Sequence, residues 1–197
     1  MSLLLPRATR ALLLVNIAVF LLEPLAPNLI MGQFALWPLS SARFEPWQLL
    51  TYAFLHGSFM HIFFNMLALF MFGGPLERYL GQRRFLSFFF VCVLSAALTQ
   101  LAVQSAGGPQ EETIGASGGV FGLLLAFAWY FPRARILVLP VPWPLPAWLV
   151  VSVYSLVELF AGVRGWQPDV AHFAHLGGLA GGAACILFWR ARRGFNR

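Results

Sequence analysis

The sequence predicts an all-α polytopic membrane protein, with one membrane-embedded domain of six transmembrane helices over residues 1–197. Of its residues 59% are hydrophobic and only 10% are charged, and the mean hydropathy is +0.75. A soluble domain does not need so much apolar surface. Six apolar segments also approach the ~20 residues that cross a bilayer. They cover residues 10–26, 59–77, 84–105, 115–131, 147–163 and 170–189.

The first segment, residues 10–26, could be a membrane helix or an amino-terminal signal peptide. No small-residue cleavage site follows it, so we expect the first span. The link that follows, about 27–58, is too long for a plain loop. It carries Trp37 and Trp47, whose rings favour the membrane–water interface. We therefore expect a long, partly structured interfacial loop between the first and second helices.

The later links are shorter, and two of them have a distinct composition. We expect residues 107–113, which include two glutamates, to form a short mobile loop outside the membrane. Four prolines at alternate positions in 139–146 remove backbone N–H donors, so a polyproline-like strap is expected at the inner surface. Cys92 and Cys185 both lie inside apolar runs, which gives no indication of a disulfide.

Arginine placement predicts the orientation of the chain. With the amino terminus inside the cell, 11 of the 13 arginines lie on the cytoplasmic side, and only Arg43 and Arg164 lie outside. The opposite orientation would violate the positive-inside rule. The net charge of +6 therefore reflects topology rather than nucleic-acid binding, and both termini are expected in the cytoplasm.

Ser117 begins the fourth segment after a glycine-rich approach. A hydroxyl in the first turn of a helix lies beside unpaired N–H groups, which could stabilise an oxyanion if the serine attacked a carbonyl. A helix cap or a small packing residue is the alternative. The pattern Gly-x-Ser-x-Gly also matches the nucleophile elbow of soluble hydrolases, but no strand precedes it.

Ser117, His175 and Asn65 are predicted to lie at nearly one depth. They stand 16, 15 and 13 residues from the first cytoplasmic arginine of their helices, or ~20–24 Å at ~1.5 Å per residue. His61, 17 residues away, comes out at ~26 Å by the same count. A polar cavity lined by the histidines, Asn65 and Ser117 is expected to open to the outside.

Small residues predict that the fourth and sixth helices approach closely. Glycines four residues apart pack membrane helices backbone to backbone, and usually they do nothing more. Here such packing would bring the Ser117 hydroxyl within ~3 Å of the His175 ring. The pairs are Gly118 and Gly122, and Gly178 and Gly182, with Gly115/Gly119 and Gly177/Gly181 alongside.

These motifs, taken together and in order, resemble the rhomboid intramembrane serine proteases. The resemblance rests on Ser117 in Gly-Ala-Ser-Gly, His175 in Ala-His-Leu-Gly-Gly and the pair His61-x-x-x-Asn65. The run Gly-Gly-Pro-Leu-Glu-Arg at 73–78 also fits, and the likeness extends from the first helix to the last. It implies a six-helix rhomboid-like bundle.

The resemblance implies a Ser–His dyad without a carboxylate. Ser117 would be the nucleophile and His175 the base. The Asn65 amide, the His61 ring and the Ser117 N–H would form the oxyanion hole. Phe121, where many family members have Tyr, would stack on the His175 ring.

Several residues around the dyad are expected to have supporting or structural roles. His56 is expected near the cavity, in water retention or in structure, and Gly178 and Gly182 are expected to support helix packing. His172 is expected to be structural. Glu158 should face the bundle or a polar neighbour because a carboxylate is costly in lipid. The family often has Trp-Arg in the first loop where this chain reads Trp47-Gln48, so the anchor of that loop is in question.

The implied activity is hydrolysis of peptide bonds in or near the transmembrane segments of single-spanning membrane proteins, with no cofactor. Membrane lipids would surround the chain, nucleic acid is not expected as a partner, and a bacterial inner membrane is the expected location. A catalytically silent rhomboid-like protein that binds membrane clients is one alternative, and a small transporter is another. A metal site built from the histidines was a further possibility, with no carboxylate at their depth to complete it. The sequence names neither a substrate nor an oligomeric state.

Overall fold

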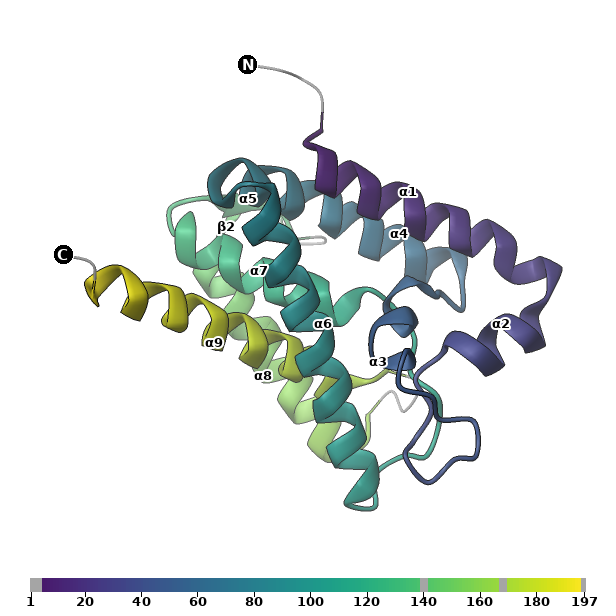
Figure 1. The fold of residues 1–197 in the computed structure, drawn as a ribbon. Helices are drawn as coiled ribbons and strands as arrows, with labels where there is room; N and C mark the ends of the chain where they lie inside the picture. The colour runs from purple at the N-terminus through teal and green to yellow at the C-terminus, as the bar shows by residue number, and fades with distance from the viewer. Residues whose placement is uncertain (1–4, 139–141, 167–169, 196–197) are drawn as a thin grey trace.

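The computed structural model describes residues 5–138, 142–166 and 170–195, with side chains up to residue 192. It is a helical bundle in which α6 crosses the centre of the molecule (Figure 1). Among the described residues, five helices are long and apolar enough to cross a membrane. The prediction of an all-α polytopic membrane protein is thus confirmed. A sixth apolar helix, α7, has only 14 residues, so the count of six spans stays a prediction.

The long helices lie close to the predicted segments. The second span is a continuous run of α4, a π-helical turn η3 and α5, and the last span begins at His172 rather than at residue 170. The bounds are α1 (Arg7–Leu22) with the 3-10 turn η1 (Glu23–Leu25), α4 (Phe59–Ala68), η3 (Leu69–Gly73), α5 (Gly74–Leu80), α6 (Gln82–Ser105), α7 (Ser117–Tyr130), α8 (Ala147–Arg164) and α9 (His172–Phe195).

The long first loop contains α2 (Pro27–Phe34), α3 (Gln48–Thr51) and the 3-10 turn η2 (Tyr52–Phe54). Gln48 is fully buried in it. The Gln48 amide nitrogen donates to the carbonyls of Arg43 (2.7 Å) and Gln33 (3.3 Å), and its oxygen accepts from the backbone N–H of Trp37 (3.2 Å). A neutral amide that both donates and accepts therefore anchors the loop at the position where the family often has arginine.

The link between α6 and α7 is attached to that loop. Leu36 and Thr113 form an antiparallel bridge with N–H···O distances of 3.0 and 2.9 Å. The Gly115 N–H then donates to the Tyr52 carbonyl (2.9 Å). The expected mobile loop is thus held by backbone bonds at Thr113, four residues before Ser117.

Part of the proline-rich link forms a small hairpin. Strand β1 (Arg135–Ile136) pairs antiparallel with β2 (Leu145–Pro146). Residues 139–141, where the polyproline-like strap was expected to begin, lie outside the described residues.

Glycine allows α9 to lie against two neighbours at once. A Cβ at Gly178 would meet the backbone of Gly118 on α7, whereas Cβ atoms at Gly177 and Gly181 would meet Thr99 and Ser95 of α6. The predicted backbone approach between α7 and α9 is therefore present. Gly177 and Gly181 instead allow α9 to pack against α6. Helix α6 also carries the fully buried Phe85, Phe88 and Phe89.

Candidate active site

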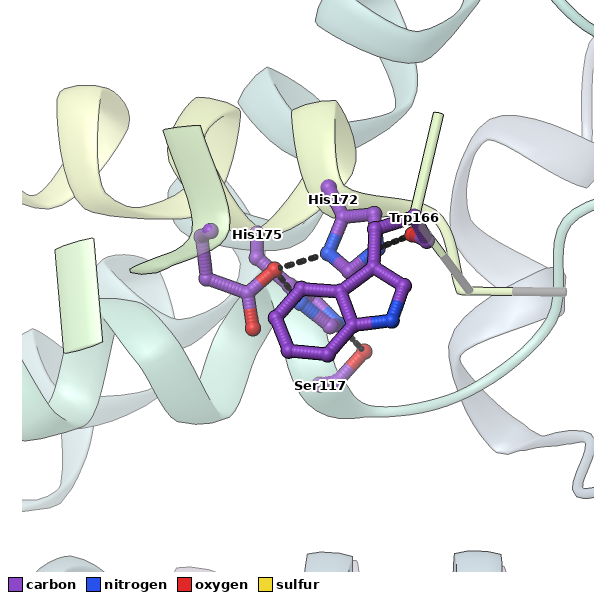
Figure 2. A network of polar contacts seen from close by, with 5 residues as sticks. Ser117, Trp166, His172 and His175 are labelled. Carbon is purple, nitrogen blue, oxygen red and sulfur yellow. Dashed lines mark hydrogen bonds and ion pairs between the residues drawn. The ribbon is translucent and has the colours of Figure 1, made fainter. Parts of the chain in front are cut away.

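The hydroxyl of Ser117 and the imidazole of His175 meet between α7 and α9. The Ser117 Oγ and His175 Nε2 atoms are 2.8 Å apart (Figure 2). This is hydrogen-bond distance, and it is the distance expected of a nucleophile and its base. Since His175 lies one turn before Gly178 and Ser117 directly precedes Gly118, the glycine contact between the helices sets this separation.

The chain reaches Ser117 through a turn that requires glycine. Gly115 has a φ of +117°, a conformation that side chains with a Cβ rarely adopt. A Cβ at Gly115 would also lie 2.6 Å from the His61 Nε2 atom. Ser117 is the first residue of α7, so its hydroxyl stands beside the unpaired N–H groups of the helix start.

His61 and Asn65 lie four residues apart on α4. This helix contacts the turn at Gly115 through the His61 ring. The His61 ring packs against Gly115, which brings the imidazole close to the serine. The Asn65 amide nitrogen donates to the His61 carbonyl (3.0 Å), and this leaves its second amide hydrogen for another acceptor. The His61 ring is therefore placed beside the turn that leads to Ser117, whereas the Asn65 amide is bonded within its own helix.

Two further rings support these histidines. Phe121, one turn after Ser117, stacks on the His175 ring with centroids 4.3 Å apart and planes at 9°. His56 is fully buried with its ring edge-on to His61, the centroids 5.0 Å apart. Burial, and then the nearby charge of His61, lowers the pKa of His56 to about 4, which keeps it uncharged at neutral pH.

A carboxylate that sequence reasoning left without a role stands beside the dyad. The Glu158 Oε2 atom, on α8, lies 2.9 Å from His175 Nδ1 and 2.6 Å from His172 Nδ1. The expectation that no carboxylate lies at the histidines' depth was therefore wrong. Glu158 stands 11 residues after the start of α8, or ~17 Å, but the arginine of α8, Arg164, lies at its other end, so the count used for Ser117 did not extend to it.

His172, which was expected to be structural, belongs to the same network. Its Nε2 atom is 2.8 Å from the Trp166 carbonyl oxygen, so the ring bridges the end of α8 and the carboxylate (Figure 2). A cavity of about 110 Å³ beside it is lined by parts of α6, α8 and α9 and by residues of the links that precede α7 and α9. Of the six polar residues expected around a cavity, only His172 lines this one.

Glu158, His172 and His175 also have the composition of a metal site, with ligand atoms within 4.8 Å of one another. Two ligands of one tetrahedral zinc ion lie about 3.3 Å apart, given bonds of about 2.0–2.1 Å. The contact between Glu158 and His172 is much shorter at 2.6 Å. The arrangement therefore fits a hydrogen-bonded ion pair better than a metal site.

Comparison with known proteins points to one family. A family model described as a Rhomboid domain matches residues 43–192. The chain is 31% identical over 189 residues to "Rhomboid protease GlpG" of Klebsiella pneumoniae, covering 89% of this chain and 60% of that one. It is 29% identical over 193 residues to the protein of that name from Photorhabdus laumondii, covering 95% of this chain and 63% of that one. It is 37% identical over 131 residues to "Rhomboid protein 1, mitochondrial" of Saccharomyces cerevisiae, covering 64% of this chain and 37% of that one. The chain spans less than two thirds of the length of each of these curated relatives.

Proposed function

The chain belongs to the rhomboid family, and on this premise we propose that it is an intramembrane serine endopeptidase. It hydrolyses peptide bonds in or near the transmembrane segments of membrane proteins. The observation that carries the proposal is the 2.8 Å contact between the Ser117 hydroxyl and the His175 imidazole inside a helical membrane protein. The two alternatives, a silent client-binding protein and a transporter, give no reason for this contact.

The reaction proceeds in two halves. The Ser117 Oγ attacks the carbonyl carbon as its proton passes to His175 Nε2. The tetrahedral intermediate then breaks its C–N bond, and His175 returns the proton to the leaving amine. A water molecule attacks the resulting ester, giving one proton to His175 Nε2. Collapse of the second intermediate releases the carboxylic acid product, and Ser117 Oγ recovers its proton from His175.

The negative oxygen of each intermediate lies where three donors can reach it. These are the Ser117 N–H at the start of α7, the His61 ring and the free amide hydrogen of Asn65. Losing one such donor typically costs about 3 kcal/mol of transition-state stabilisation. The packing of His61 on Gly115 and the position of Ser117 at the first helical residue support this assignment.

The substrates are single-spanning membrane proteins. The protease lies in the inner membrane of a bacterium. Both of its termini are in the cytoplasm, and its active site lies toward the outer side of that membrane. An intact helix hides its carbonyls in its own hydrogen bonds, and an unwound segment in lipid leaves them unsatisfied. Cleavable segments therefore contain weak helix formers such as Gly, Ala or Ser, and they unwind on reaching the polar groups around Ser117.

The test uses purified protein in liposomes with a fluorescently tagged single-spanning substrate, and a fluorophosphonate probe that phosphonylates reactive serines. Ser117→Ala is expected to abolish both labelling and cleavage, and His175→Ala to lower turnover by about 10²–10⁴-fold. Ser155→Ala is the matched control, because the Ser155 hydroxyl only donates to the Val151 carbonyl of its own helix (2.8 Å). Labelling or cleavage that persists in Ser117→Ala would refute the proposal.

A further inference from the structure

We propose that Glu158 is a positioning residue that completes a Ser117–His175–Glu158 triad, a role that rests on the proposed protease function. Three helices contribute one member each: Ser117 from α7, His175 from α9 and Glu158 from α8. The His175 ring joins the other two, with Nε2 2.8 Å from the serine Oγ and Nδ1 2.9 Å from the carboxylate Oε2. The family resemblance implied a dyad only, so the contact with this carboxylate goes beyond what that resemblance implied.

The place of Glu158 on α8 already indicates a specific role. Of the described residues of α8, most are apolar and many face outward, including Leu156, Val157 and Leu159. Glu158 is only 9% exposed and points inward. A carboxylate in such a helix costs several kcal/mol unless it is paired. The partners it finds are the two histidines of α9.

The chemistry of His175 requires an acceptor at Nδ1. To take the serine proton, Nε2 must be unprotonated, so the one proton of the neutral ring sits on Nδ1. The Glu158 Oε2 atom is at ion-pair distance from Nδ1, although the ring N–H does not point closely enough along that line to count as a hydrogen bond. Catalytic hydrogen bonds are often poorly aligned without substrate and tighten when it binds.

The stack with Phe121 cannot supply this restraint. It fixes the plane of the His175 ring at 9° to the phenyl ring. A half-turn about the Cβ–Cγ bond keeps that plane but exchanges Nδ1 with a carbon atom. The Ser117 contact at Nε2 opposes that half-turn, but a hydroxyl both donates and accepts, so it does not select the tautomer. An acceptor at Nδ1 does, and Glu158 provides it.

His172 in turn holds Glu158. The Trp166 carbonyl can only accept, so His172 Nε2 bears a proton toward it. His172 Nδ1 meets the same Oε2 atom that faces His175, and one carboxylate oxygen can accept from both rings. The His172 ring therefore holds Glu158 between the Trp166 carbonyl and the His175 ring. Glu158 remains ionised throughout, and the serine proton travels only to His175 Nε2.

Because both rings meet one oxygen, Glu158→Gln has a sharp consequence. With an amide in place of the carboxylate, His172 Nδ1 accepts from the Gln NH₂ group placed at that position. The same NH₂ then faces His175 Nδ1 and drives the His175 proton to Nε2, the wrong tautomer for a base. We expect kcat to fall about 100-fold or more, with KM within about twofold, since Glu158 meets the His175 ring at Nδ1 and the serine meets it at Nε2.

Glu77→Gln is the matched control. Glu77 is also buried, and its carboxylate accepts from the N–H groups of Ala8 and Thr9 at the start of α1 (2.9 and 2.7 Å), far along the chain from the site. This exchange is expected to lower the melting temperature and to leave kcat of the folded protein unchanged. If Glu158→Gln instead lowers the melting temperature as Glu77→Gln does while keeping kcat within threefold of the parent, Glu158 is a structural carboxylate and the proposal fails.

A second readout does not depend on activity. In protein labelled with ¹⁵N-histidine, the His175 signals are assigned by their loss in His175→Ala. We expect a proton on Nδ1 in the parent and in Ser117→Ala, and a proton on Nε2 in Glu158→Gln. An unchanged tautomer in Glu158→Gln would overturn the inference. If the parent shows no Ser117-dependent cleavage, the proposed function fails, and this spectrum still decides whether Glu158 sets the tautomer of His175.

Discussion

Gly178→Ala tests the idea that helix packing sets the distance between Ser117 and His175. A Cβ at Gly178 would lie 2.8 Å from the carbonyl carbon of Gly118 and 3.1 Å from its Cα, and closer still to its carbonyl oxygen. These are backbone atoms of a helix, so they cannot rotate away. Ordinary contact begins at 3.4 Å, so α7 and α9 must separate by more than about 1 Å to clear the carbonyl oxygen.

This separation acts directly on the site. His175 is one turn before Gly178, and Ser117 is adjacent to Gly118, so most of the shift reaches the 2.8 Å contact. Its length would become about 3.5–4 Å, beyond the range for proton transfer. A misplacement of about 1 Å costs about 100-fold in rate, and overpacking of this kind costs about 1–3 kcal/mol of stability.

The assay is cleavage of the tagged substrate in liposomes, with thermal unfolding of the same samples. Gly182→Ala should show a smaller effect, because its Cβ would lie no closer than 3.1 Å to Phe88, 3.3 Å to Gly122 and 3.5 Å to Cys92. Gly32→Ala is the control, since a Cβ there meets nothing within 4 Å. The reasoning would be refuted if folded Gly178→Ala cleaved within threefold of Gly32→Ala.

Two further predictions concern the long loop. Gln48→Ala removes three hydrogen bonds to loop backbone groups and should lower the stability of the folded state by about 2–3 kcal/mol. Thermal unfolding measures this loss. A melting temperature equal to that of the parent would contradict the prediction. The pKa of His56 is about 4 in the folded protein, against 6.5 ordinarily, so acid protonates the unfolded chain first. Stability should therefore fall as the pH drops from about 6.5 to about 4, by up to about 1.4 kcal/mol per pH unit from this group. His56→Gln should flatten that part of the curve, and parallel curves for the two proteins would exclude the assignment.

Much of this architecture could be predicted from the sequence because the bilayer imposes simple rules. Span length is fixed by the thickness of the hydrocarbon, so apolar segments gave the long helices to within a few residues. The rise per residue then placed Ser117 and His175 at one level, and the glycine pairs indicated which helices approach. Each of these signals is either a short sequence pattern or a number of residues counted along one helix.

The contacts of Gln48 and Glu158 could not be predicted in the same way. Gln48 bonds three backbone groups of a loop whose path no periodic pattern describes. Glu158 meets His172 and His175 only because of how α8 is rotated and tilted against α9. In a membrane, lipid and helix neighbours are equally apolar, so hydropathy does not mark the inward face of a helix.

The amino-acid sequence by itself thus determined the membrane-spanning class and indicated that the serine and the histidine lie at a common level along their helices. The rotation of each helix decided everything that requires two side chains to meet from different spans: the 2.8 Å contact between Ser117 and His175, and the carboxylate behind the histidine. The level of a residue follows from the number of residues along its own helix. The direction in which its side chain points follows from close packing among several helices at once, and only the tertiary structure shows that direction.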